Sequence, residues 1–455
     1  MVLGRPASDK GMTLVELMVT MIIASIVAAS TFMFFAGQQR VYETQTKMLN
    51  VQQNVWAAME VLTRFVRSEG SGMYGCVRPV GGIVPFPPPN RSLGGDLGDD
   101  PPVVTGVRDL SQRPNAGLRA YNAATGQVQR IPPLWIVDQV AGNDASIAGI
   151  VPGTDVITVA FGNRSSGTNF DSPLFGAVTN LSYMIAPSLP ANLAMFQPGE
   201  FIVLIGRPGM EVGGAALLSD VGCTLFQITG VAATLNIASG GTSACLPPPA
   251  TGCASSVWNP PATVANLVPG TYAATPSTTS GIRNFGEFWW VRFAIRTKAQ
   301  DGTVLTTLGI PGVTHDVPVL TMERIDGSPT TGPQVLAEGI EDLQVAYACD
   351  LNADGVLAED PNNPANPATD EWMLNDPNDV IATSNALKCN QPSAIRLTLV
   401  ARSLTEDNGI DAALTENGRP AVENRARHTL DNNFTTGRDQ FRRRVLTTTV
   451  YPRNN

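Results

Sequence analysis

Residues 10–36, KGMTLVELMVTMIIASIVAASTFMFFA, contain the feature that decides the fold. The apolar run from Met12 to Ala36 has 25 residues and one charged side chain, Glu16. As a helix it is roughly 37 Å long, which exceeds the roughly 30 Å hydrocarbon core of a bilayer. A secretory signal has a shorter apolar region, of about 7 to 15 residues, and a small-residue cleavage pattern, which is missing here. We therefore predict a membrane-spanning helix that the mature protein retains.

The charge within this run carries a family resemblance. A carboxylate at bilayer depth costs about 2.5 to 3.5 kcal/mol on insertion scales, so Glu16 needs a partner, a proton or access to the headgroups. The stretch resembles the signal of type IV prepilins, which has a short basic leader ending in glycine (Gly11), an apolar first mature residue (Met12) and glutamate at the fifth mature position (Glu16). The resemblance implies that a prepilin peptidase cuts between Gly11 and Met12 and methylates the new amine.

Cleavage creates an ammonium group at Met12 that could partner Glu16. When apolar helices pack side by side with an axial stagger, the Glu16 carboxylate of one subunit can meet the Met12 ammonium of its neighbour. Because burial penalises two ions heavily, such a pair adds little net stability. We expect it mainly to set the register between subunits.

The helical pattern continues beyond the apolar run. Val41, Met48, Val55, Met59, Leu62 and Val66 follow one another at helical spacings, with charged side chains between them. This predicts one helix from about Thr13 to Arg67, roughly 80 Å long, whose second half can cover a sheet. A membrane anchor followed by an unrelated coiled-coil stalk is the alternative.

The rest of the chain predicts β-structure. Gly and Pro account for 43 and 35 residues, charged side chains make up only 15%, and the formal charge is −9. Segments rich in β-branched or aromatic residues, bounded by turn residues, predict antiparallel strands. These segments are 155–161, 200–206, 224–231, 287–297, 318–325, 335–350, 394–403 and 442–455. The predicted fold class is α+β and pilin-like, with the long helix packed on an extended antiparallel sheet.

The C-terminal strands sharpen the resemblance. EGIEDLQVAY (338–347), RLTLVARS (396–403) and RRRVLTTTVYPRNN (442–455) resemble the PilW family of minor pilins. The resemblance implies a subunit that primes filament assembly at or near the tip. Its implied partners are other minor pilins, the major pilin, the prepilin peptidase and the inner membrane. It implies an exported, periplasmic region before assembly and a place in the surface pilus afterwards.

We expect five regions on this basis. They are a leader (1–11), the transmembrane half of the helix (12–36), its amphipathic half (37–69), a β-rich exported region (70–334) and a C-terminal antiparallel region (335–455) with an insertion (350–388).

Six cysteines all follow the apolar run. On the exported side of a membrane, disulfides are the default expectation. Cys349 and Cys389 bracket the insertion, so a bridge between them would close a loop of about 40 residues and contribute roughly 4 kcal/mol in a chain-entropy account. Pairing of the other four stays open, as does the alternative of free thiols in a reducing compartment.

The insertion also contains a calcium-loop pattern. Asp350, Asn352 and Asp354 occupy positions 1, 3 and 5, Gly355 position 6, and the carbonyl of Val356 position 7. Position 12 is Pro361, so the usual bidentate carboxylate is lost or shifted. Calcium is the one cofactor that the sequence suggests, and a solvated turn is the alternative.

Other functional classes receive little support. With only four lysines and no basic cluster, nucleic acid is not an expected partner. The two histidines, His315 and His428, fit no catalytic or metal-binding template, so we expect no enzymatic activity. A minor pseudopilin of a type II secretion system is the related alternative. A pilin-anchored tip adhesin that binds a surface or carbohydrate through Trp258, Trp289 and Trp290 is the alternative of another class, although neighbouring Trp289 and Trp290 must face opposite ways on a strand.

Overall fold

The structure is a computed structural model of the chain. It describes residues 13–71, 118–122, 127–131, 133–137, 150–151, 153–163, 171–173, 183–184, 196–205, 211–212, 215–216, 223–231, 235–238, 245, 252–259, 281–298, 317–325, 332–350, 354–360, 370–373, 392–404 and 443–452.

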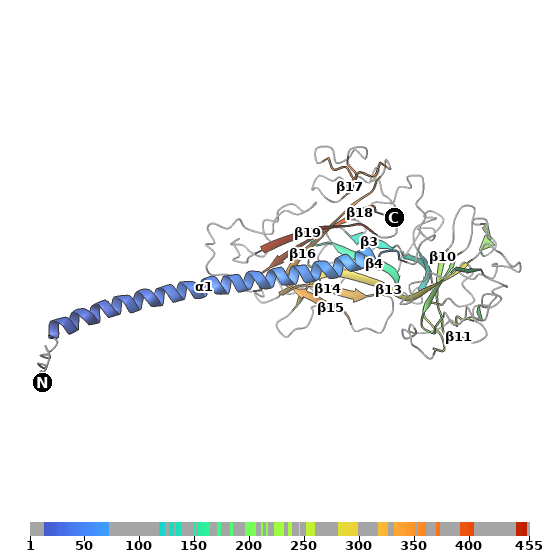
Figure 1. The fold of residues 1–455 in the computed structure, drawn as a ribbon. Coiled ribbons are helices and arrows are strands. Elements are labelled where there is room, and N and C mark those ends of the chain that lie inside the picture. The colour runs from blue at the N-terminus through green and yellow to red at the C-terminus, as the bar shows by residue number, and fades with distance from the viewer. Residues whose placement is uncertain are drawn as a thin grey trace, which may run out of the picture.

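A single 54-residue helix, α1 (Leu14–Arg67), begins the described part of the chain. Its membrane-spanning half projects alone, and its second half lies along the β-structure (Figure 1). The helix is long and apolar enough to cross a membrane, and none of its most apolar window is buried. It ends where Gly70 adopts a φ of +64°, a conformation that L side chains disfavour.

Nineteen strands are described. They are β1 (Leu118–Asn122), β2 (Gln127–Ile131), β3 (Leu134–Val137), β4 (Val156–Asn163), β5 (Asp171–Pro173), β6 (Tyr183–Met184), β7 (Phe201–Ile205), β8 (Glu211–Val212), β9 (Ala215–Ala216), β10 (Cys223–Gln227), β11 (Gly230–Val231), β12 (Leu235–Asn236), β13 (Gly281–Lys298), β14 (Val317–Arg324), β15 (Gln334–Glu338), β16 (Ile340–Ala348), β17 (Trp372–Met373), β18 (Ala394–Arg402) and β19 (Arg443–Val450).

Strand β13 organises the largest sheet. Its first residues pair with β7 and β5, whereas its later residues pair with β4 and β14. Over 18 residues it extends about 60 Å, enough to belong to two parts of the molecule. A bulge between Asn284 and Gly286 lies near the end of the pairing with β7, just before the pairing with β4 begins at Glu287. There the Asn284 side chain accepts a hydrogen bond from the Gly286 amide (2.8 Å).

A four-stranded sheet, β17-β16-β18-β19, forms from the C-terminal strands. Gly339, with a φ of +77°, lies between β15 of the large sheet and β16 of this one. Asp155, at the start of β4, joins the sheets a second time. Its main-chain amide donates to the Leu343 carbonyl (2.8 Å), and its carboxylate accepts from the Val345 amide (2.7 Å).

The main hydrophobic core lies between α1 and these two sheets. Val55, Leu62 and Val66 of the helix pack with residues of β4, β13, β14, β16 and β18. Phe65 adds a cluster of rings, with its centroid 5.8 Å from that of Phe161, 5.9 Å from Trp289 and 5.3 Å from Phe293. The amphipathic half of the helix is thus held by the sheets, as its apolar spacing predicts.

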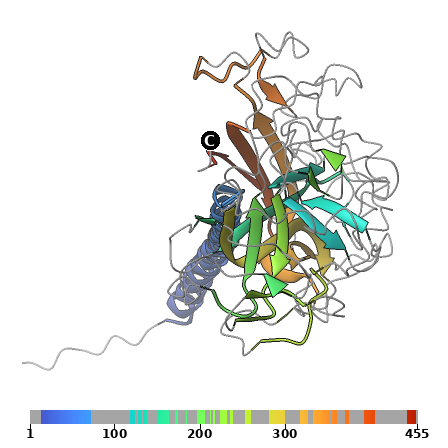
Figure 2. The ribbon, with the colours of Figure 1, turned by 90° about the vertical axis from the view of Figure 1, so that its right-hand side faces the viewer.

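A second group of strands lies beyond the C-terminal end of α1. We call β1, β2, β5, β7 and β10, the first residues of β13 and the segment 252–259 the distal module. It occupies the pole opposite the projecting helix (Figure 1), and the end-on view places its green strands in front of the helix (Figure 2). Phe201, Leu225, Trp258 and Phe285 form part of its core.

The α+β, pilin-like fold class is confirmed, and so is the continuous helix over nearly its predicted length. The predicted strands all appear, although two of them are divided. The segment 224–231 forms β10 and β11, and the segment 335–350 is divided at Gly339 into β15 and β16. Pairing is antiparallel in every described pair except β1 with β10, which is parallel. This one pair departs from the prediction that all strands are antiparallel. The five predicted regions stay predictions.

Candidate functional site

The N-terminal end of α1 is capped by the side chains of Thr13 and Glu16. Thr13 is the N-cap, and its hydroxyl accepts a hydrogen bond from the Glu16 amide (3.2 Å). In return the Glu16 carboxylate accepts one from the Thr13 amide (3.0 Å). This reciprocal arrangement is a capping box, and Thr-x-x-Glu is its sequence signature. Glu16 therefore has a local structural role that our sequence analysis missed, although the signature was present.

The processing residues Gly11 and Met12 lie outside the described residues. Cleavage between them, methylation of the new amine and its pairing with Glu16 of a neighbour stay predictions.

The exposed side chains of the spanning half give α1 an apolar surface. Ile22, Ile26 and Phe32 are each more than half exposed, and they share this environment with most of the run from Leu14 to Phe35. A surface of this size on a helix that projects alone needs a bilayer or other apolar helices around it. Both environments are available to a subunit that is first inserted into a membrane and then assembled.

The face that packs on the sheet is shorter than predicted. Val55, Met59, Leu62 and Val66 are buried, as expected. Val41, which the same spacing places on this face, is 53% exposed, whereas Val51 is 4% exposed, so the covered part of the face begins after Val41. The apolar periodicity is thus longer than the sheet that covers it.

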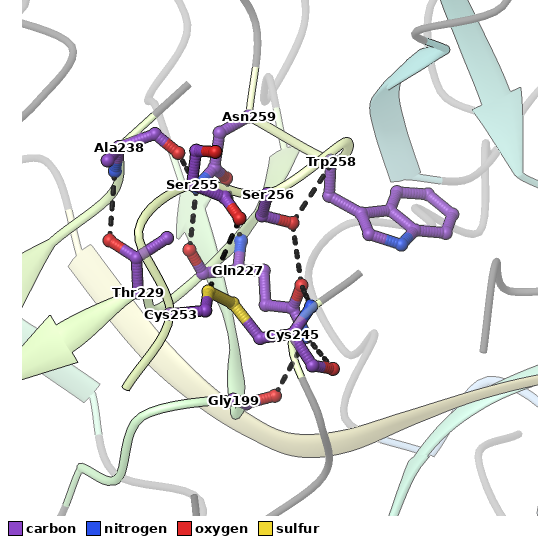
Figure 3. The surroundings of a disulfide bond; sticks show 10 residues. All are labelled: Gly199, Gln227, Thr229, Ala238, Cys245, Cys253, Ser255, Ser256, Trp258 and Asn259. Carbon is purple, nitrogen blue, oxygen red and sulfur yellow. Dashed lines mark hydrogen bonds between the residues drawn. A yellow bond between two sulfur atoms is a disulfide. The ribbon is translucent and has the colours of Figure 1, made fainter. Parts of the chain in front are cut away.

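A disulfide anchors part of the distal module (Figure 3). Cys245 and Cys253 are bridged, with their Cα atoms 5.7 Å apart, and Gln227 of β10 lies at the centre of the surrounding hydrogen bonds. The Gln227 side chain accepts from the Cys245 amide (2.8 Å) and the Ser256 hydroxyl (2.6 Å). It donates to the Gly199 carbonyl (3.0 Å). The fully buried amide therefore has partners for both its oxygen and its nitrogen.

The Asn259 side chain forms two hydrogen bonds with the main chain of Gln227, as the main chain of a neighbouring strand would. Its side chain accepts from the Gln227 amide (2.9 Å) and donates to the Gln227 carbonyl (2.8 Å). The segment 252–259 is thereby fixed on β10 although it forms no strand of its own. The separation of eight residues between the two cysteines was the only sequence signal for this pairing.

Only one cysteine of the predicted Cys349–Cys389 disulfide has a described side chain. Cys349 is completely buried and disulfide-bonded, and its partner lies outside the residues whose side chains are described. Its pairing with Cys389 stays a prediction. The main chain nearby is held independently, because the Cys349 amide donates to the Glu371 carbonyl (3.0 Å) and the Glu371 amide donates to the Ala358 carbonyl (2.9 Å).

The calcium-loop residues are partly described. Asp350 accepts from the Gly355 amide (3.0 Å) and Asp354 from the Val356 amide (2.7 Å), so both carboxylates stabilise the turn. Asp350 Oδ1 is buried and has no hydrogen-bond partner in the described part of the chain. Asn352 lies outside that part. No group of three His, Cys, Asp or Glu side chains among the described residues could hold a metal ion. The calcium site stays a prediction.

The tryptophans suggested for a carbohydrate-stacking surface are buried or partly buried. Trp258 and Trp290 are 4% and 1% exposed, and they pack together in the distal core. Trp289 faces the other way, stacks on Phe161 and is covered by the Arg324 guanidinium, 4.2 Å from its ring centroid. The opposite orientation of the two neighbours is confirmed, whereas the stacking surface is wrong because Trp258 and Trp290 fill the interior and the partly buried Trp289 is packed against Phe161 and Arg324.

The membrane-length helix, its N-terminal signal and the antiparallel sheets define a class of protein, the pilin-like subunits that are anchored in a membrane before assembly. Comparison with known families assigns the chain within this class. The prokaryotic N-terminal methylation motif matches residues 6–32, and the family of type IV pilus-assembly protein W matches residues 298–454. No curated protein and no solved structure matches the chain. The two matches support a PilW-like minor pilin that acts in assembly of the type IV pilus, and they imply interaction with the pilus machinery and the prepilin peptidase.

Proposed function

We propose that this minor pilin occupies the tip of the pilus, or a position next to it, and primes assembly there together with other minor pilins. The observation that carries this proposal is the distal module, which lies beyond the C-terminal end of α1 (Figures 1 and 2). The module is joined to the helix-packed sheets through the continuous strand β13.

A distal extension has unequal consequences at the two ends of a subunit. Subunits whose helices pack side by side with an axial stagger have their exported parts stacked along the filament. The next subunit towards the tip would place its exported part near the end of α1, where the distal module already lies. A subunit on the membrane side meets no such obstacle, so this minor pilin can begin a stack that the major pilin continues.

The same orientation defines the proposed location before assembly. α1 lies in the inner membrane, and the sheets and distal module lie in the periplasm. The Cys245–Cys253 disulfide supports this location, because disulfides form and persist in oxidising compartments. After assembly the subunit belongs to the surface pilus. We assign it a structural, non-enzymatic role.

An adhesive role for the distal module is the second candidate. Among the described residues the module lies farthest from the membrane anchor (Figure 1), so at a tip it would be the first of these parts to meet a surface. Any such contact must use residues other than Trp258 and Trp290, which are buried, and Trp289, which is packed against Phe161 and Arg324. Loss of attachment with normal piliation, after changes confined to this module, would support this role.

The stoichiometry of purified filaments tests the tip position. Pili are sheared, separated into short and long fractions, and the ratio of this subunit to the major pilin is measured by quantitative mass spectrometry. A tip subunit gives a ratio that falls in inverse proportion to mean filament length. A ratio that is the same in both fractions contradicts the proposal, because it means that the subunit is distributed along the filament.

A further inference from the structure

Strand β19 forms one edge of the four-stranded C-terminal sheet. It pairs with β18 over eight consecutive residues, from Arg443 to Val450, without a bulge. In the described part of the chain no other strand pairs with β19. One side of a strand about 26 Å long therefore presents main-chain amides and carbonyls that have no strand partner among the described residues.

The sequence of β19 offers little protection against a further strand. Native sheet edges are commonly protected by proline, lysine, inward-pointing charges or bulges. After two arginines, β19 continues as VLTTTV (445–450), in which every residue except the leucine is β-branched. Val445 is 43% exposed, and Tyr451, directly after the strand, is 65% exposed. An added strand would bring side chains against both of these residues.

The edge begins at the membrane side of the packed part of α1. The Asn54 side chain donates to the Glu338 carbonyl (3.1 Å), and the Arg402 amide donates to the neighbouring Gly339 carbonyl (2.7 Å). Arg402 is paired with Arg443, so the first residue of β19 lies near the level of Asn54. From there β19 lies alongside the packed half of the helix (Figure 1).

Positive charge at this end of β19 indicates the chemistry of the partner. The Arg443 guanidinium is matched by Glu341, to which its terminal nitrogen donates (3.3 Å). Arg444 is exposed and has no ion-pair partner in the part of the chain that the structure describes. The whole chain has a formal charge of −9, so this positive charge is local. A complementary segment carries a carboxylate at the position that meets Arg444.

The direction of the sheet excludes a second copy of β19 as the added strand. Every described pair in this sheet is antiparallel, so an antiparallel strand continues its pattern. Because β19 lies alongside α1, antiparallel pairing of two β19 strands would turn one α1 away from the membrane that both helices must enter. The occupant is therefore a segment of different sequence, and its C-terminal end lies beside Arg444.

We propose that β19 accepts an extended segment of another exported subunit of the pilus machinery as a fifth, antiparallel strand of this sheet. A carboxylate near the C-terminal end of that segment pairs with Arg444. In such strand addition the main-chain hydrogen bonds supply the affinity, and the side-chain contacts define the register. The proposal rests on the proposed function, because it names a surface and a partner for the assembly role.

Hydrogen exchange of the full-length protein tests the strand addition. Exchange of the 443–450 amides is measured by mass spectrometry in the purified protein and in the complex that co-purifies from membranes with the other pilus subunits. The amides of β18, which has a strand on each side, are the internal control and should exchange slowly in both samples. We expect about half of the β19 amides to exchange quickly in the purified protein and at least about tenfold more slowly in the complex.

Two results would overturn the proposal. Fast exchange in β19 that is the same in the purified protein and in the complex would mean that no strand is added. Slow exchange of all β19 amides in the purified protein would mean that another segment of this chain already occupies the edge.

Substitution of Arg444 tests the predicted carboxylate. Arg444→Glu should reduce co-purification with the partner about tenfold or more and remove the added protection of β19. Arg64→Glu changes the net charge equally at an exposed site on α1 and should leave both near the wild-type level. The melting temperatures of both variants should match that of the wild type, because both side chains are exposed. Equal effects of the two substitutions would contradict the contact with Arg444.

A photoreactive phenylalanine analogue at Val445 distinguishes the possible occupants. We expect crosslinks to a different exported subunit of the pilus machinery, and crosslinks only between copies of this chain would overturn the proposal. Protection of β19 in the complex without the length-dependent stoichiometry of filaments would refute only the tip position. The length-dependent stoichiometry without protection of β19 would refute only the strand addition.

Discussion

Glu16 has two roles in this account, one within its own helix and one between subunits. Its hydrogen bonds with Thr13 cap α1, which typically contributes about 1 kcal/mol. We propose that its charge meets the Met12 ammonium of a neighbour. Removing one ion of such a buried pair leaves the other unpaired, which destabilises the contact by about 3 to 5 kcal/mol. Variants can separate the two roles because only one of them needs the charge.

We predict that Glu16→Gln and Glu16→Ala both weaken co-purification with other minor pilins, since both remove the charge. Thr13→Ala removes the cap but retains the charge, so it should leave co-purification near the wild-type level. Pull-down from membranes, with processing checked by N-terminal sequencing that begins at Met12, measures this. Loss in Thr13→Ala and Glu16→Ala but not in Glu16→Gln, which can still cap the helix, would assign the effect to the cap.

Glu69 predicts a dependence of stability on pH. It lies just after α1, and complete burial raises the pKa of its carboxyl group to about 8. Because the folded protein then holds a proton that the unfolded chain releases near pH 4.5, the free energy of unfolding should fall as the pH rises from about 4.5 to 8. Glu69→Gln should remove this part of the dependence and stabilise the protein at pH 8.5. Denaturant midpoints of both proteins at pH 6 and 8.5 test this. An unchanged pH dependence in the variant would exclude Glu69 as its source.

At the scale of elements, the packing of α1 on the sheets depends on Phe65. Its ring contacts those of Phe161, Trp289 and Phe293. Removing an aromatic ring from a packed site costs about 3 to 5 kcal/mol when burial is complete, so Phe65→Ala, at a half-buried position, should cost about 2 to 3 kcal/mol. The exposed neighbour gives the control, Arg64→Ala, which should cost less than about 0.5 kcal/mol. Thermal unfolding in detergent measures both, and equal effects would mean that the ring cluster does not hold the helix.

The insertion loop supports a prediction that couples calcium to a disulfide. If Cys349 pairs with Cys389, the loop is held at both ends and Asp350 and Asp354 need little further ordering to bind an ion. Oxidised protein should therefore bind calcium more tightly than reduced protein, and Asp350→Ala and Asp354→Ala should weaken both forms. Because these carboxylates also accept hydrogen bonds from main-chain amides, melting without calcium must be compared first. Calorimetry that detects no binding at millimolar calcium would refute the ion site. Peptide mapping that pairs Cys349 with another cysteine would refute the Cys349–Cys389 disulfide.

Elements were predictable from the sequence wherever one local pattern dominates. The span and the amphipathic half of α1 follow from apolar periodicity, and β4, β14 and β18 follow from β-branched residues between turns. The end of the buried helix face was not predictable, because Val41 and Val55 share one periodicity and differ only in whether a sheet covers them. The Gln227 and Asn259 contacts bring together residues 32 positions apart. Local spacing contains no information about such a contact.

For the whole molecule, the sequence indicated the class of protein but not its shape. Residues 80–330 carried no assignable motif, yet they supply the distal module and much of the sheet that covers α1. Strand β13 connects this module to the sheet under the helix. Its first residues pair with β5 and β7 of the module, and its later residues pair with β4 and β14. That arrangement depends on pairing between residues far apart in the sequence, which strand propensity does not determine.

The position of this subunit in assembled pili can be observed by electron microscopy. An epitope is added after Asn455, beyond the final strand β19, and intact pili are labelled with gold-conjugated Fab fragments and examined by electron microscopy. A subunit at the tip gives gold at one end of each labelled filament and none along its length, with an untagged strain as the control. Gold distributed along the filaments would contradict the tip position, because a subunit with a distal module beyond its helix would then have neighbours on both sides.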